Sequence, residues 1–159
     1  MKLRSGLYLL AALSLCGLLS GCVSVKRPVD TGDFSPLEIR ALQTRTYDEQ
    51  DVLATLKTVL NVLQDEGYVV EFGNPELGLL NASKTIAGGI NTFTYATWTI
   101  TATVHVSSFG EQTKVRISLY EKIESYFGER SAKPIVDPKE YQQLFAKLDR
   151  SIFIHKQGL

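Results

Sequence analysis

Few side chains in this sequence are of a type and spacing that could do acid–base or metal chemistry. The two histidines, His105 and His155, lack the partners that a metal site or a Ser–His–acid triad needs. We interpret His105 as a surface residue of a polar strand face, opposite Arg116, and His155 as a charge that suits the last turn of a helix. We therefore predict no metal, no cofactor and no enzymatic activity.

Two further groups of residues have simpler structural interpretations. Asp48, Glu49 and Asp51 form an acidic cluster that could bind a cation, but helix capping already accounts for them. Gly88-Gly89 lacks the Lys and the Ser or Thr of a phosphate-binding loop, so we interpret it as a loop tip. Neither group is a predicted site.

The most specific chemical signal lies at the amino end. Lys2 and Arg4 are followed by a 13-residue uncharged apolar run, residues 7–19, which is the pattern of a secretory signal peptide. As a helix this run would span about 20 Å, which is too short for a hydrocarbon core of about 30 Å. We therefore expect residues 1–21 to be a signal peptide, and the chain to leave the cytoplasm.

The signal ends in Leu19-Ser20-Gly21-Cys22, where small residues precede a nucleophilic thiol. This tetrapeptide resembles the lipobox of bacterial lipoproteins: Leu, then Ser or Ala, then Gly or Ala, then Cys. The resemblance implies cleavage before Cys22, a diacylglycerol on its thiol and, in many bacteria, an acylated amino group. Several acyl chains, at about 0.8 kcal/mol per buried CH₂, make a durable membrane anchor. The alternative is an ordinary signal peptide with a cysteine placed by chance.

Val23 follows the cysteine, and this residue bears on the final location. In Gram-negative lipoproteins, Asp at this position resembles an inner-membrane retention signal. Its absence favours the periplasmic face of the outer membrane, provided that the host is Gram-negative.

Composition limits what the mature chain can do. Loss of residues 1–21 removes two of the 17 basic and none of the 17 acidic residues, so 138 of the 159 residues remain with a net charge of about −2. That length suits one domain. This near-neutral net charge does not indicate a surface that binds nucleic acid or anionic lipid headgroups. Because Cys16 leaves with the signal and Cys22 is lipidated, disulfides and cysteine chemistry are excluded.

The elements that would position any site follow the tether. Residues 22–36 carry several Pro, Gly and Asp, which indicates a flexible tether of at most roughly 50 Å, and 37–159 form a single domain. We predict a strand at 38–46, then a helix at 49–66 that Asp48 caps and Gly67 ends. Strands at 68–72 and 78–84 would flank a turn at 73–75, and a loop would follow at 85–94.

A long hairpin is the clearest structural signal. Apolar residues from Ala96 to Val106 alternate with polar ones from Thr97 to Ser107, which predicts a strand with one buried face. A Gly110-Glu111 turn would pair Val106 with Val115 and His105 with Arg116. Asp137-Pro138 then begins a helix over about 138–155. The predicted order is β-α-β-β-β-β-α, an α+β fold in which two helices cover one face of an antiparallel sheet.

This topology is similar to the helix-grip modules of some envelope lipoproteins, including one accessory subunit of the outer-membrane barrel-assembly machinery. The span from Thr44 to Lys84, with its Leu-Gln-Asp-Glu-Gly-Tyr junction, also resembles small uncharacterised proteobacterial envelope lipoproteins. Neither resemblance implies a particular activity.

The polar face of the hairpin is the remaining candidate site. A solvated β-face is one interpretation, because Thr favours strands. The other is a docking face, where Tyr and Arg are enriched, extended by the apolar side chains of the 85–95 loop. Its candidate residues are Tyr95, Thr99, Thr101, Thr103, His105, Arg116, Tyr120 and Lys122.

Three functional hypotheses follow from the anchor and this face. The first is a lipid-anchored, non-enzymatic envelope module that binds another envelope component, most simply a protein. The second is a carrier that holds a small hydrophobic ligand or lipid between the sheet and the last helix, with a cavity at Trp98, Ile100 and Leu119. An enzyme is the third and least favoured.

Overall fold

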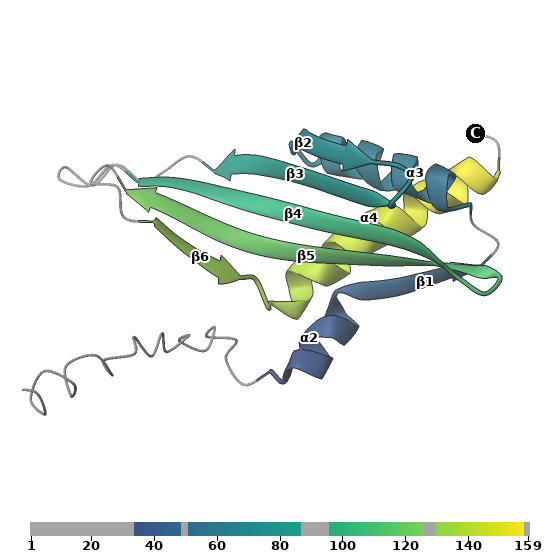
Figure 1. Cartoon of the computed structure of the whole chain (residues 1–159), viewed down its shortest axis with the longest axis horizontal. Coiled ribbons are helices and arrows are strands. Elements are labelled where there is room, and N and C mark those ends of the chain that lie inside the picture. Colours follow the sequence, from purple (N-terminus) through teal and green to yellow (C-terminus); the bar gives the residue numbers. More distant parts are fainter. Residues whose placement is uncertain (1–33, 49–50, 87–95, 126–129, 158–159) are drawn as a thin grey trace, which may run out of the picture.

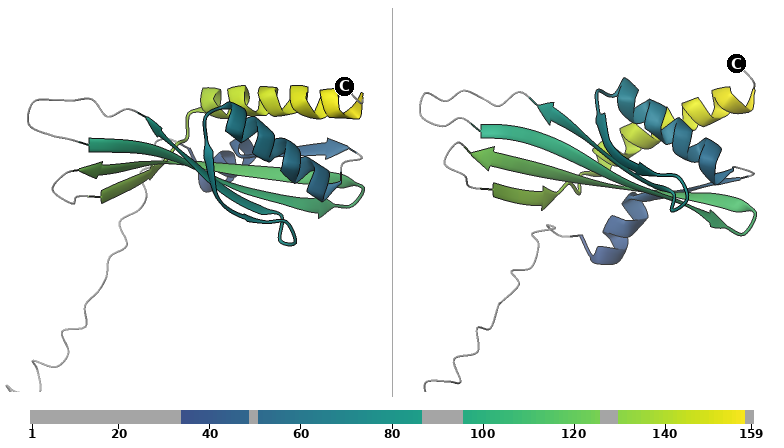
Figure 2. Two further views of the ribbon diagram at one scale, coloured as in Figure 1. Left: turned by 90° about the horizontal axis from the view of Figure 1, so that it is seen from above. Right: turned by 45° about the horizontal axis from the view of Figure 1, so that its top comes forward.

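Two helices pack against one face of a twisted antiparallel sheet, and a third, short helix lies on the other side (Figures 1 and 2). The computed structural model describes residues 34–48, 51–86, 96–125 and 130–157. The lipobox, Cys22 and Tyr95 therefore lie outside the described residues. The elements in chain order are α2 (Pro36–Leu42), β1 (Thr44–Asp48), α3 (Val52–Asp65), β2 (Val69–Asn74), β3 (Leu79–Ile86), β4 (Ala96–Phe109), β5 (Gln112–Ser125), β6 (Arg130–Pro134) and α4 (Pro138–Lys156).

The predicted α+β architecture and the predicted order of strands and helices are confirmed, with two additions. Helix α2 precedes β1, and β6 lies between β5 and α4. The strand order is β1-β5-β4-β3-β2, and β6 pairs with β5 beyond the end of β1. The central hairpin has the expected register, since Val106 pairs with Val115 and His105 with Arg116.

The core fills the space between the sheet and the two long helices. Its largest buried side chains come from both helices and from the inward positions of β4 and β5, because apolar residues recur every second position there. Helix α4 begins where expected, with Asp137 as N-cap and Pro138 in the first turn. His155 lies in its last turn, also as expected. None of the described helices is long and apolar enough to cross a membrane.

The strand predicted at 38–46 is wrong over its first half. Residues 36–42 form α2, because Ser35 and Glu38 make a reciprocal capping box and Pro36 occupies the first turn. The Ser35 backbone N–H donates to the Glu38 carboxylate at 2.8 Å. Pro36 was predicted to be the last residue of the tether, but it is the first residue of α2.

The N-cap of α3 is Asp51 and not Asp48. The Asp51 carboxylate accepts hydrogen bonds from the backbone of Leu53 and Ala54. Asp48 instead extends β1, where it pairs with Gln112 and accepts a hydrogen bond from that side chain. Pairing with β5 thus delays the start of the helix.

Strand β2 also continues further than predicted, through Asn74, so that the turn comprises residues 75–78. Gly78 ends this turn with a φ of +62°. Its carbonyl accepts a hydrogen bond of 2.8 Å from the Val106 N–H, so this turn is fixed directly to β4.

Candidate functional site

The predicted docking residues of β4 and β5 lie on the sheet face that points away from α3 and α4. They alternate with Ala102, Val104, Ile117 and Leu119, which are buried under the helices. We call this surface the polar face. Its described members are Thr99, Thr101, Thr103, His105, Arg116, Ser118, Tyr120 and Lys122.

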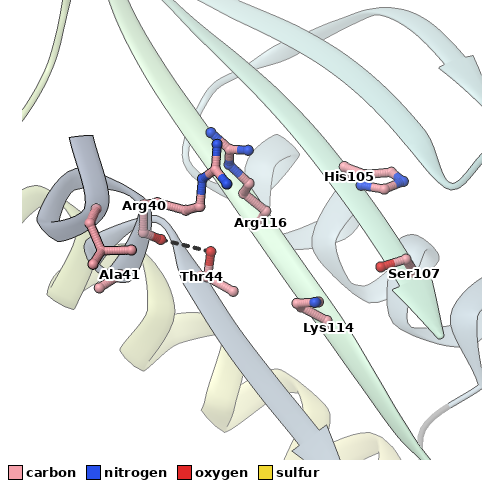
Figure 3. A pocket seen from close by; sticks show the side chains of 8 residues that line it. Arg40, Ala41, Thr44, His105, Ser107, Lys114 and Arg116 are labelled. Atoms are coloured by element: carbon pink, nitrogen blue, oxygen red, sulfur yellow. Dashed lines mark hydrogen bonds between the residues drawn. The ribbon is translucent and has the colours of Figure 1, made fainter. Parts of the chain in front are cut away.

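Helix α2 borders the polar face and encloses a hollow of about 400 Å³ against it (Figure 3). We call it the basic hollow. Among the described residues that line it there are two arginines, a lysine and a histidine, and no carboxylate. Figure 3 shows Arg40 reaching from α2 toward Arg116 of β5. The lining residues are Leu37, Arg40, Ala41, Thr44, His105, Ser107, Lys114 and Arg116.

Arg116 is held in place by a buried amide. The side-chain oxygen of Gln43 accepts hydrogen bonds from Arg116 Nη2 at 3.1 Å and from Ser118 Oγ at 3.3 Å. Gln43 ends α2 and is only 3% exposed. A guanidinium fixed by a buried partner loses less side-chain freedom when a ligand binds.

The same amide connects the hollow to the core. Gln43 Nε2 donates to the hydroxyl of Tyr141 at 3.4 Å, and Tyr141 is 1% exposed. The Tyr141 hydroxyl donates to the Ile135 carbonyl at 2.8 Å and accepts from the Leu119 N–H at 3.2 Å. A continuous series of hydrogen bonds therefore passes through the sheet from the basic hollow to α4.

The cations of the hollow are not neutralised by a carboxylate of the described chain. The ion pairs of the described residues join Arg45 to Asp149, Arg130 to Glu124 and Lys147 to Glu66. None of these six residues lines the hollow. Lys114 lies over the ring of Phe109, 4.2 Å from its centroid. Several like charges facing one cavity favour an anionic ligand, which relieves their repulsion.

A second, shallower hollow continues along the polar face from the first. It is lined by Thr103, His105, Arg116, Ser118 and Tyr120 and has a volume of about 320 Å³. His105 and Arg116 belong to both hollows. The two hollows are thus continuous along the polar face.

Thr101 does not have the exposure expected of a docking residue. It lies between Ser83 and Tyr120 in the sheet and is 5% exposed. Its hydroxyl has no hydrogen-bond partner within the described part of the chain. Thr99 is half-buried, whereas Thr103, His105 and Lys122 are exposed.

The residues of α2 that complete the hollow were missed by sequence reasoning. Arg40 was placed in a strand, and Leu37 at the start of the domain had no assigned role. The signal that could have found them is Ser35-Pro36 with Glu38 three residues after the cap, which is the capping pattern of a helix start. Lys114 lies on the polar side of β5 but was not among the candidate docking residues, and its neighbour α2 was not foreseen.

The side chains at the place proposed for a carried ligand belong mostly to the core. Leu119 is buried, Ile100 packs against the core, and Tyr141, Phe145 and Leu148 fill the space beneath α4. Trp98 lies further along β4, paired with Ile86 and Ile123, and is partly exposed.

The described residues contain no group of three His, Cys, Asp or Glu side chains that could hold a metal ion. No protein-family model and no curated protein matches this sequence. Function is therefore inferred from the residues and from the geometry of the polar face.

Proposed function

We propose that this protein is a lipid-anchored, non-enzymatic envelope module that docks another envelope component, most simply a protein, on its polar face. The observation that carries the proposal is the connected depression around His105 and Arg116, which is lined by cations and hydroxyl groups and is preorganised by Gln43. Arg and Tyr at the centre of such a surface are typical of binding interfaces.

The anchor is the second component of the proposal. Lipid on Cys22 would hold the domain by a short tether at the periplasmic face of the outer membrane in a Gram-negative host. A partner would then be sought within the reach of that tether. The alternative, a carrier of a small hydrophobic ligand or lipid between the sheet and α4, has no supporting observation among the described residues.

The experiment is affinity purification of the intact lipidated protein after crosslinking in cells. We expect the wild type to recover a specific envelope protein, and the polar-face variant Tyr120→Ala with Lys122→Ala to lose it. The matched control removes an exposed aromatic residue and an exposed lysine from the helices, Phe153→Ala with Lys57→Ala, and should recover the same protein. Recovery of no specific protein, or equal recovery by the polar-face variant, would contradict the proposal.

A further inference from the structure

The basic hollow lies where the tethered chain enters the fold, and this position indicates what fills it. We propose that the hollow binds phosphate groups of anionic phospholipid headgroups in the membrane that carries the anchor, so that the α2 end of the polar face lies on the bilayer. The inference rests on the proposed function, because it requires lipid on Cys22.

The length of the tether keeps the hollow near the headgroups. Thirteen residue steps separate Cys22 from Ser35, the N-cap of α2. A flexible chain of this length has a root-mean-square span of about 20 Å. Because α2 itself supplies Leu37, Arg40 and Ala41 to the hollow, the tether ends at the binding site. Headgroups are then present at high effective concentration, and even weak attraction is sufficient to orient the domain.

The chemistry of the hollow matches a phosphate. Arg40, Lys114 and Arg116 face a common space without a carboxylate among the described lining residues. A guanidinium presents paired N–H donors that fit phosphate oxygens, and a lysine adds a mobile charge. The near-neutral total charge of the chain conceals this cluster, because Arg40 comes from α2 and Lys114 and Arg116 come from β5, and only folding brings them together.

Large apolar side chains accompany these cations. Leu37 is 76% exposed on α2, and Phe109 is 57% exposed at the tip of the central hairpin. Apolar side chains beside basic ones are typical of segments that lie in the membrane interface.

This orientation leaves the rest of the polar face available. Thr99 lies eight residues from Ser107 along β4, which corresponds to roughly 26 Å in a strand. Thr99 and Lys122 pair across β4 and β5 at that distal end. The basic hollow would orient the domain on the lipid, and the rest of the polar face, from the shallower hollow beside Tyr120 to the distal end, would meet the protein partner.

The experiment uses the lipidated mature chain in vesicles of phosphatidylethanolamine and phosphatidylglycerol. Since the only cysteine of the mature chain is the lipidated Cys22, an introduced cysteine is a unique site for a spin label. One label replaces Glu111 in the hairpin turn near the hollow, and the other replaces Thr97 at the distal end of β4. A nickel chelate carried on lipid headgroups reports how close each label lies to the bilayer.

We expect strong relaxation of the label at position 111 and little at position 97. Neutralisation of the hollow by Arg40→Gln with Lys114→Gln should lower the ratio of docked to free domain about fivefold for each charge removed. Lys57→Gln with Lys139→Gln removes the same charge from exposed positions on the helices and should change nothing. Raising the salt concentration from about 0.1 M to about 1 M should release the hollow, because the Debye length falls from about 10 Å to about 3 Å.

Equal relaxation at both positions, or a wild-type signal in the Arg40→Gln, Lys114→Gln variant, would overturn the inference. Either result is expected if the hollow binds an acidic protein segment in place of lipid. The acyl mass on Cys22 and the recovery of a partner through Tyr120 and Lys122 are measured separately. Failure of this inference is therefore distinguishable from failure of the proposed function.

Discussion

Gln43 and Tyr141 connect the two sides of the sheet through a side-chain hydrogen bond. Gln43 orders Arg116 on the polar face, and Tyr141 satisfies backbone groups of Leu119 and Ile135 on the core side. Buried polar groups of this kind are stable only while all partners are present. The precision of the basic hollow therefore depends on a tyrosine in α4.

Tyr141→Phe tests this connection. The ring is retained, but the Ile135 carbonyl, the Leu119 N–H and the Gln43 amide each lose a partner. We expect the free energy of unfolding to fall by about 2 kcal/mol, measured by urea denaturation. Tyr120→Phe removes a hydroxyl from an exposed ring and should stay within about 0.5 kcal/mol of the wild type. Equal effects of the two substitutions would contradict the network.

A second prediction at the scale of single residues concerns the loss of folding stability at alkaline pH. Burial, with Glu140 and then Glu66 nearby, raises the pKa of Tyr68 from 10.0 to about 12. Burial, followed by the hydrogen bond to Asp149, also raises the pKa of Tyr47. The folded state thus favours the neutral phenols, and the contribution of Tyr68 is complete below pH 10 and is lost as the pH rises through about 12.

Urea denaturation over a series of alkaline pH values measures this loss. We expect the free energy of unfolding of the wild type to decline above pH 10, and Tyr68→Phe to decline less steeply, because it removes one of the two groups. A wild type whose stability stays constant from pH 8 to about pH 12 would contradict the assigned burial.

The elements with strong periodicity could be predicted from sequence, and those fixed by caps were less evident. Alternation over β4 and β5 gave both the buried face and the register, because one buried face permits one register only. Helix α2 is seven residues long and buries none of them, so hydrophobic periodicity could not reveal it. Its sequence signals were the capping box and the proline in its first turn. The site was accordingly predicted on β4 and β5, but without the α2 side of the hollow.

At the scale of the elements, the close approach of the turn between β2 and β3 to β4 can be tested by substituting Gly78. A Cβ added at Gly78 would lie 1.9 Å from the Val106 carbonyl oxygen, and the residue also has a left-handed φ of +62°. Gly78→Ala should therefore lower the free energy of unfolding by about 3 kcal/mol in urea denaturation, from backbone strain and displacement of β4.

Gly110→Ala is the matched control for this turn. Gly110 has a similar φ of +64°, but open space surrounds the added Cβ. Only the backbone cost remains, which we expect to be about 1 kcal/mol. If both substitutions cost the same, the close approach of Gly78 to β4 is not important for stability.

For the whole molecule, the anchor and the fold have complementary roles in the account proposed here. The described domain has a packed core and an uncovered polar face, and it contains no metal-ligand group among the residues placed by the structure. The lipid on Cys22 would supply location, and the polar face would supply binding. No periodicity rule could reveal a hollow whose cations come from α2 and β5, two segments far apart in the sequence.

The most direct test of the account is acylation of Cys22, measured by palmitate labelling in cells and by the intact mass of the mature protein. We predict a labelled wild type that begins at Cys22, whereas Cys22→Ser should carry no label and remain an uncleaved precursor. Cys16→Ser should be labelled and cleaved like the wild type, since that cysteine leaves with the signal. Normal processing of Cys22→Ser, or an unlabelled wild type, would contradict the central claim.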